Sequence, residues 1–215
     1  AVVEQMFTST ISDPIFSMKS IIRPTTSGPS AHTEKTNARN ARIRAITVGI
    51  DPTRGDVEML GTRLNTLYTD ATTAFTNEGF EVHTRRLTLR PVRASERATR
   101  FSIWNQLATV SRAAEHAGVR WTCLPFVADT RAHAEEWRIA AVEIIRRFPR
   151  CFINFIISEN AAIYHDALGE TAQAVLDIAN LSKNGFDNFR VGTGCNLVAN
   201  TPFFPFSYHD GHDGF

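Results

Sequence analysis

Apolar residues in this chain recur with two different periods, which indicates strands that alternate with helices. The run at 43–50 is rich in β-branched residues and is stopped by an Asp-Pro pair, as expected of a strand. Apolar residues then recur at helical spacing over 57–75, with Asp56 as a fair N-cap and Gly79 just past the end. The pattern predicts a strand followed by a helix.

The same alternation continues towards the C-terminus. We predict strands at 80–89, at 119–124 (ended by Pro125), at 151–157 and from 188–191, and helices at 97–117, at 130–148 and within 160–182, the last as one helix or as two interrupted near Gly169. Short links between alternating elements predict right-handed crossovers and a parallel sheet. Strands that are apolar on both faces predict helices on both sides. The expected fold class is α/β, an open sheet or about half of an α/β-barrel.

The first 41 residues differ from the rest. Residues 11–22 are apolar enough to dock on a surface, and residues 23–40 are rich in Pro, Thr, Ser, Gly and Asn, as in a linker. We therefore divide the chain into an extension at 1–41 and an α/β domain at 42–215. One alternative for the protein follows directly: it could be an assembly protein that uses residues 1–41 to dock neighbouring subunits.

Composition narrows the class of protein. The chain has 215 residues, 43% of them apolar, which is enough for a real core in one large domain. A net charge of +1 gives no electrostatic argument for binding nucleic acid or an anionic membrane. No apolar run approaches the roughly twenty residues of a membrane span. The three cysteines are widely spaced and form no Cys-x-x-Cys, so we expect a reducing, cytoplasmic location.

Polar residues follow the ends of the predicted strands, and ligands of parallel sheets bind beyond those carboxyl ends. The candidate substrate-binding residues are Asp51, Arg86, Asn160 and Asn196, and the candidate catalytic residues are Glu159, Cys195 and His209. Asp51 and Glu159 could serve as acid or base, although Asp51 could instead close a turn and Glu159 could cap a helix.

Each remaining candidate also has a structural alternative. Arg86 lies inside an apolar strand, where it either pairs with a carboxylate or faces a ligand anion. Cys195 follows a Gly-Thr-Gly bend and could be a nucleophile, or it could be a small buried apolar residue. His209 could be a general base or a polar anchor, and with His212 and the neighbouring aspartates it also resembles part of a metal site.

Known cofactor motifs are missing from the sequence. The Gly192-Thr193-Gly194 bend satisfies neither the P-loop nor the dinucleotide fingerprint, and no distant ligand pair completes a metal site. The sequence therefore identifies no cofactor and no metal.

From Ile43 onward the chain resembles the uncharacterised UPF0210 (DUF711) family. The resemblance rests on the sequences at 43–51, 84–88 and 188–191, and above all on Thr-Pro-Phe-Phe-Pro-Phe-Ser-Tyr-His at 201–209. It implies an α/β-barrel related in fold to the glycyl-radical enzymes, without implying their chemistry. No catalytic role carries over, because the family has none assigned.

The resemblance also implies that family members are much longer and continue past the Pro-Phe-Phe-Pro motif, whereas this sequence stops at Phe215. A few parallel strands cannot close a barrel and leave an open edge. One hypothesis is that a second chain from the same precursor completes the barrel, through self-processing or proteolysis near Phe215; the other is that the sequence is a fragment. A homo-oligomer is a further possible assembly.

The leading functional prediction is a subunit of a soluble α/β-barrel enzyme that acts on a small polar or anionic metabolite by hydrolytic or acyl/amide chemistry. Its rival from another class is a non-catalytic module that senses a small ligand with the same residues. An enzyme should bring titratable groups together in a closed site, whereas a sensor should show satisfied polar groups without an activated nucleophile or base.

Overall fold

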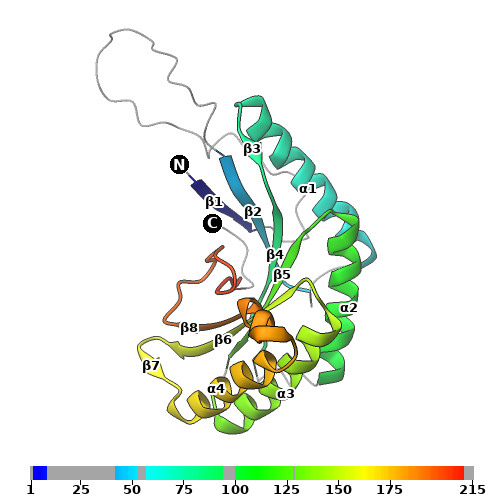
Figure 1. Cartoon of the computed structure of the whole chain (residues 1–215). Coiled ribbons are helices and arrows are strands. Elements are labelled where there is room, and N and C mark those ends of the chain that lie inside the picture. The colour runs from blue at the N-terminus through cyan, green and yellow to red at the C-terminus, as the bar shows by residue number, and fades with distance from the viewer. Residues whose placement is uncertain (1, 9–41, 53–56, 94–99, 128, 211–215) are drawn as a thin grey trace, which may run out of the picture.

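A curved, mostly parallel sheet carries the fold and forms a half-barrel (Figure 1). The computed structural model describes residues 2–8, 42–52, 57–93, 100–127 and 129–210. The parallel strands pair in the order β1 (Val2–Thr8), β2 (Arg42–Ile50), β4 (Arg85–Leu89), β5 (Trp121–Val127), β6 (Cys151–Glu159) and β8 (Val191–Cys195). Two short strands complete the sheet: β3 (Glu81–Val82) pairs with β2, and β7 (Ala162–Ile163) runs antiparallel to β6. The expected α/β half-barrel is confirmed.

The helices lie along one side of the sheet in Figure 1. They are α1 (Val57–Asn77), α2 (Arg100–His116), α3 (Arg131–Arg147) and α4 (His165–Ala179), followed by the 3-10 helix η4 (Lys183–Arg190). Alternate residues of β2, β4, β5 and β6 face this helical layer and form the main core with it. Phe126 of β5, for example, stacks on Trp137 of α3 with ring centroids 5.1 Å apart.

The opposite, inner face of the sheet is covered by a non-helical stretch, residues 196–210, which we call the inner segment. Figure 1 shows it folded back across the concave side of the sheet. Its backbone accepts hydrogen bonds from Thr47 of β2 and from the Cys123 thiol of β5. The expectation of helices on both faces is therefore wrong for the described residues. The inner segment, rather than helices, buries the second face, and several strand residues on that face are polar, among them Thr47, Thr88 and Asn154.

Three glycines make room for the inner segment. A Cβ atom at Gly49 of β2 would lie 2.6 Å from Cγ of His209, and one at Gly192 of β8 would lie 2.8 Å from Cγ of Pro205. A Cβ atom at Gly194 would collide with Leu197. Such approaches are far inside van der Waals contact, so only glycine allows the segment to sit this close to the sheet.

Two predicted interruptions of elements are wrong. Pro125 does not end its strand, because β5 continues to Val127. The carbonyl of Pro125 accepts a hydrogen bond from the Val92 N–H, which lies beyond the end of β4. The nitrogen of Pro125 faces the same side, where β4 has already ended, so its missing N–H removes no bond within a strand pair. Gly169 does not interrupt a helix either, since α4 runs through it.

Two strand boundaries also differ from those predicted. The strand expected at 80–89 divides into β3 and β4 around Thr84, whose hydroxyl donates to the Arg44 carbonyl. The strand expected from 188 begins at Val191, because η4 extends to Arg190. The buried Arg190 guanidinium donates to the carbonyls of Ile145, Phe148 and Cys151, which holds this turn against the end of α3.

The extension predicted at 1–41 contains one described element, β1, which adds an edge strand beside β2. The apolar stretch at 11–22, the linker at 23–40, the Asp56 N-cap and the His212 part of the tail lie outside the described residues. The boundary between 1–41 and 42–215 stays a prediction. None of the described helices is both long enough and apolar enough to cross a membrane.

Candidate functional site at the carboxyl ends of the strands

An ion pair joins the ends of β4 and β6. The Arg93 guanidinium donates to both carboxylate oxygens of Glu159, at 2.9 and 2.6 Å, and the Tyr164 hydroxyl donates to the same carboxylate at 3.0 Å. The Glu159 side chain is 18% exposed and that of Arg93 is 39% exposed. A two-point arginine–carboxylate contact fixes both side chains more firmly than a single-point ion pair does.

The surroundings of Glu159 keep it ionised. Its hydrogen bond from Arg93 lowers the pKa of the carboxyl group below the ordinary value, and this effect exceeds the opposing effect of burial. Burial raises the pKa of the nearby Tyr208 hydroxyl, and the negative charge of Glu159 raises it further. Glu159 is therefore suited to accept hydrogen bonds or to hold Arg93 in place, and it is poorly suited to donate a proton near neutral pH.

A second ion pair lies at the ends of β2 and β4. Arg90 donates to Asp51 at 3.3 Å, and the Asp51 side chain is only 4% exposed. Asp51 follows Gly49 by two residues, so strand alternation places it on the inner side of β2. The carboxylate lies where the sequence placed it, with its charge balanced by an arginine from the neighbouring strand.

His209 belongs to a network within the inner segment. Its Nδ1 lies 2.9 Å from Oδ1 of Asn200, while Asn200 Nδ2 donates to the Asp210 carboxylate at 3.2 Å and the Asp210 N–H donates to Asn200 Oδ1 at 3.3 Å. These two bonds to Asp210 define the orientation of the amide, so its oxygen accepts from His209. In the neutral imidazole Nδ1 then carries the proton, and Nε2 keeps its lone pair.

The backbone ties the same histidine to the sheet. The His209 N–H donates to the carbonyl of Leu89, the last residue of β4, at 3.2 Å. The imidazole itself packs on Gly49 and is 2% exposed with the rest of the residue. We call the assembled group the mouth: Asp51, Arg90, Arg93, Glu159, Tyr164, Asn200, Tyr208, His209 and Asp210.

The amino-acid sequence matches the model of a protein family over most of its length. The family described as "Uncharacterised ACR (DUF711)" matches residues 35–214. The chain belongs to the DUF711 family. No curated protein matches this sequence. The half-barrel is shown by the structure itself, and a relation to the glycyl-radical enzymes stays a prediction.

Two asparagines predicted to bind substrate build the turns beside the mouth of this DUF711 chain. Asn196 Oδ1 accepts from the Ser158 hydroxyl at 2.9 Å and from the Ala161 N–H at 3.1 Å. Asn160 and Asn196 both have positive φ, 50° and 47°, which asparagine tolerates better than most residues. The Asn196 side chain thus joins β8 to the turn after β6, which is a positioning role.

The predicted cysteine and arginine lie away from the mouth. Cys195 is exposed, and strand alternation puts it on the face opposite Gly194, which packs on the inner segment. The structure therefore does not pair Cys195 with His209. Arg86 lies near the start of β4, is buried, and has its guanidinium carbon 5.2 Å from the centre of the Phe204 ring.

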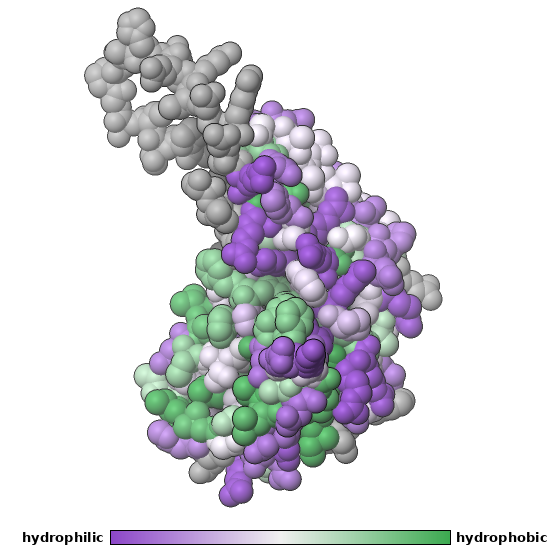
Figure 2. Space-filling model, in the orientation of Figure 1, coloured by the Kyte–Doolittle hydropathy of each residue, from purple (hydrophilic) through white to green (hydrophobic). Residues whose placement is uncertain are grey.

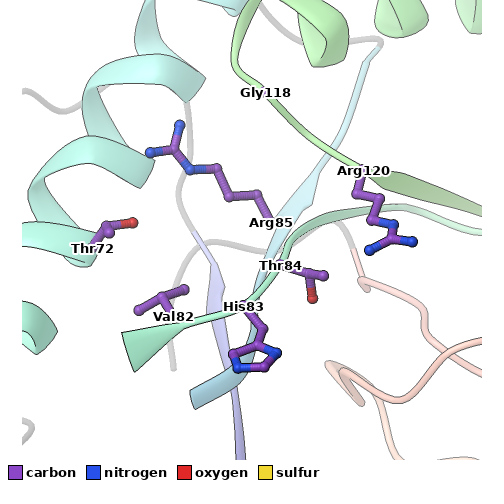
Figure 3. A pocket seen from close by; sticks show the side chains of 7 residues that line it. All are labelled: Thr72, Val82, His83, Thr84, Arg85, Gly118 and Arg120. Carbon is purple, nitrogen blue, oxygen red and sulfur yellow. The ribbon is translucent and has the colours of Figure 1, made fainter. Parts of the chain in front are cut away.

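A hollow of about 330 Å³ lies at the other end of the strands (Figure 3). Its lining includes His83, Arg85 and Arg120, which come before or at the start of β4 and β5. Figure 3 shows Arg85 extending towards α1 and Arg120 extending away from it, so the basic groups do not converge on one point. Arg85 already donates to the Ala117 carbonyl at 3.0 Å. We therefore place the candidate site at the mouth, where the charges are paired.

Sequence reasoning missed Arg93, Tyr164, Asn200 and Tyr208 as members of the mouth. Arg93 could have been singled out by its place just after β4, since residues beyond strand ends meet at one edge. Asn200 and Tyr164 carry no such signal. In the described part of the chain, no group of three or more His, Cys, Asp or Glu side chains is placed to hold a metal ion.

Proposed function

We propose that this DUF711 chain supplies the ligand-binding half of an α/β-barrel enzyme that acts on a small polar or anionic metabolite. One observation carries the proposal: two arginine–carboxylate pairs, Arg90–Asp51 and Arg93–Glu159, stand at the same edge of the sheet. A guanidinium has five N–H donors, so Arg93, which gives two of them to Glu159, has others for a ligand. Both arginines are partly exposed, as a ligand-binding residue must be.

The reaction we propose is hydrolytic or acyl/amide chemistry. In this proposal His209 accepts a proton through Nε2 from the water that attacks the substrate carbonyl, because Asn200 holds its other nitrogen protonated. His209 then gives that proton to the leaving oxygen or nitrogen when the acyl bond breaks. Glu159 stays ionised and keeps Arg93 in position. The substrate anion binds Arg93 and Arg90, which polarise and orient it.

Ligand binding can be tested with inorganic phosphate and malonate as probes, by calorimetry at low salt. We expect saturable binding that Arg93→Lys weakens about tenfold, because lysine keeps the charge but loses the two-point contact with Glu159. Arg131→Gln is the matched control: it removes an arginine with 77% side-chain exposure from the start of α3. Equal binding by Arg93→Lys and the unchanged protein would contradict an anion site at the mouth.

Turnover can be tested separately with p-nitrophenyl acetate and small anilides. The proposal predicts that His209→Gln abolishes hydrolysis, whereas Cys195→Ala retains it. If the opposite holds, the nucleophile is the cysteine and our assignment is wrong. Because rate and binding are measured independently, loss of one does not obscure the other.

A non-catalytic ligand sensor is the second candidate, and a specific observation favours it. Each carboxylate of the two ion pairs is balanced by an arginine, and burial raises the pKa of the thiols of Cys123 and Cys151, the latter to about 12. These groups are satisfied rather than activated. Saturable anion binding without turnover of any probe would identify this DUF711 chain as the sensor.

We also propose that a second chain, from the same precursor, pairs with β8. Among the described strands β8 pairs only with β6, so its other edge is open. The inner segment beside it exposes Val198 and Phe203 at 79% and 57%. Figure 2 shows apolar residues gathered on this side of the molecule, while hydrophilic residues predominate along α1 and α2.

Intact and native mass spectrometry of material from the natural source tests the second chain. We expect an equimolar partner that dissociates on denaturation, and we expect Phe203→Asp to release it. A complex that contains only copies of this chain would instead show that the open edge serves a homo-oligomer, and a monomer would refute both assemblies.

A further inference from the structure

A further pair of titratable side chains lies where β5 ends and α3 begins. Asp129 follows the last residue of β5 by two positions, and His133 lies in the first turn of α3. The imidazole Nδ1 of His133 is 2.7 Å from Oδ1 of Asp129. The side chains of Asp129 and His133 are 37% and 34% exposed, so a ligand can reach both.

Helix capping alone does not explain this pair. Thr130 is the N-cap of α3, and its hydroxyl oxygen accepts the His133 N–H at 3.3 Å, which satisfies a donor at the helix start. That cap needs neither the imidazole nor the carboxylate of Asp129. Because an ionised carboxylate only accepts hydrogen bonds, its contact with Nδ1 places the proton there, and Nε2 of the neutral ring keeps its lone pair.

Strand order brings this pair to the Arg93–Glu159 contact of the mouth. Arg93 follows β4 and Glu159 ends β6, whereas Asp129 follows β5, which lies between those two strands. The residue before Arg93 is Val92, whose carbonyl accepts the Val127 N–H at 3.0 Å. Asp129 is two residues beyond that hydrogen bond. The chain therefore leaves β5 directly beside Arg93.

Electrostatics also connect Asp129 to the mouth. The Tyr164 hydroxyl donates to Glu159 at 3.0 Å. Burial raises the pKa of this hydroxyl most, the hydrogen bond to Glu159 raises it further, and the negative charges of Glu159 and Asp129 add to the increase. The positive charge of Arg93 acts on the same hydroxyl in the opposite direction. Asp129 and Arg93 therefore both lie within electrostatic range of one phenol.

The carboxylates at this edge of the sheet differ in their partners. Asp51 and Glu159 each contact an arginine, which is always charged. Asp129 contacts a histidine, and an imidazole is positive only when it is protonated. With a neutral imidazole, the edge keeps one negative charge at Asp129, beside an arginine that has further N–H donors. A negative group next to a donor of this kind is complementary to a ligand that carries both charges.

We propose that the Asp129–His133 pair binds a protonated amino group, so that the ligand of the mouth is a small zwitterion with an amino group and a carboxylate. The ligand carboxylate binds Arg93, as in the proposed function on which this inference rests. An ammonium group has three N–H donors, and the Asp129 carboxylate and Nε2 of His133 are acceptors for two of them. A hydroxyl in the same place would bind less tightly, because it brings no charge to Asp129.

Calorimetry on the unmodified chain, at low salt and near neutral pH, tests this ligand class. Alanine, β-alanine and γ-aminobutyrate place the amino group at increasing distances from the carboxylate, and propionate and butyrate are the matched acids without it. We expect one of the amino acids to bind about tenfold more tightly than its matched acid. If none does while malonate still binds, the amino-group site is overturned and the anion site of the proposed function stands. If no anion binds, both are refuted.

Variants locate the amino-group site. Asp129→Asn removes the charge with little change in shape, and we expect it to weaken the preferred amino acid about tenfold without weakening malonate. Arg93→Lys should weaken both ligands. Asp177→Asn is the matched control, because Asp177 of α4 pairs with Arg138 of α3, and it should change neither affinity. Equal effects of the two Asp→Asn variants would overturn the assignment to Asp129. The ligand comparison on the unmodified chain decides the proposal even where a variant does not fold.

Discussion

The Gly49→Ala substitution tests whether the inner segment is held by the glycines beneath it. The added methyl group would lie 2.6 Å from Cγ, 2.7 Å from Nδ1 and 2.9 Å from Cβ of His209. The imidazole has little freedom to move, because Nδ1 is hydrogen-bonded to Asn200 and the His209 N–H is bonded to Leu89. The segment must therefore shift away from β2.

The expected cost follows from three contributions. Overpacking a filled site costs about 1–3 kcal/mol. Losing one buried hydrogen bond adds about 1 kcal/mol. Replacing glycine by alanine returns about 0.5–1 kcal/mol, because it restricts the unfolded chain. We expect Gly49→Ala to lower the free energy of unfolding by about 2 kcal/mol.

Urea denaturation measures this change, and hydrogen exchange measures protection of residues 196–210. Gly169→Ala in α4 is the matched control, since a Cβ atom there meets nothing within 4 Å. The control should stabilise the protein by about 0.5–1 kcal/mol, because glycine is unfavourable inside a helix. If Gly49→Ala is as harmless as the control and leaves exchange unchanged, the glycines do not hold the segment.

Three further predictions concern charge, thiols and the aromatic pair of the inner segment. The folded-state pKa of Glu159 is lowered, so its ionised form stabilises the fold above its ordinary value of 4.5. That contribution is lost as pH falls from 4.5 through the folded pKa, and urea titrations should show the stability gap between the unchanged protein and Glu159→Gln closing over this window. A thiol reagent should label only Cys195 in the native protein and all three cysteines after unfolding; rapid labelling of three would contradict the burial of the other two. Phe204→Ala should lower the free energy of unfolding by about 2 kcal/mol and Phe203→Ala by less than about 0.5, since Phe204 packs on Arg86 and Phe152 whereas Phe203 is 57% exposed; equal losses in urea would refute this difference.

Local sequence signals predicted the elements of the outer layer well. The β-branched run at 43–50 and the helical spacing at 57–75 correspond to β2 and α1, because burial against neighbouring elements selects those periods. The breaker signals of Pro125 and Gly169 were misleading. Proline is tolerated where a strand has lost its neighbour, and glycine is tolerated where a helix has enough other support.

The inner face could not be predicted in the same way. Gly192 and Gly194 read as a bend after a strand, although both lie within β8. Their role depends on Leu197, Pro205 and Phe206, which pack on them from beyond the strand. Such a contact leaves no periodic pattern of apolar residues in the sequence, since the inner segment has neither helical nor strand spacing.

The candidate site was predicted only as far as strand order determines it. Asp51 and Glu159 follow strands, and the rule that parallel strands present their carboxyl ends together placed them correctly at one edge. Their partners, Arg90 and Arg93, both follow β4, which neighbours β2 but is separated from β6 by β5. The sequence alone does not distinguish a carboxylate that is paired with an arginine from one that is unpaired. The side-chain geometry shows that Glu159, a candidate acid or base in the sequence, is paired with Arg93 and stays ionised.

The inner segment supplies Asn200, His209 and Asp210 to the mouth, so its position on the sheet sets the geometry there. It packs on Gly49 of β2 and on Gly192 and Gly194 of β8, so its contacts extend across the curved sheet from β2 to β8. A perturbation at the β8 end should therefore reach His209 at the β2 end through the same stretch of chain. For this reason a chain that pairs with β8 would be placed to adjust the mouth without touching it.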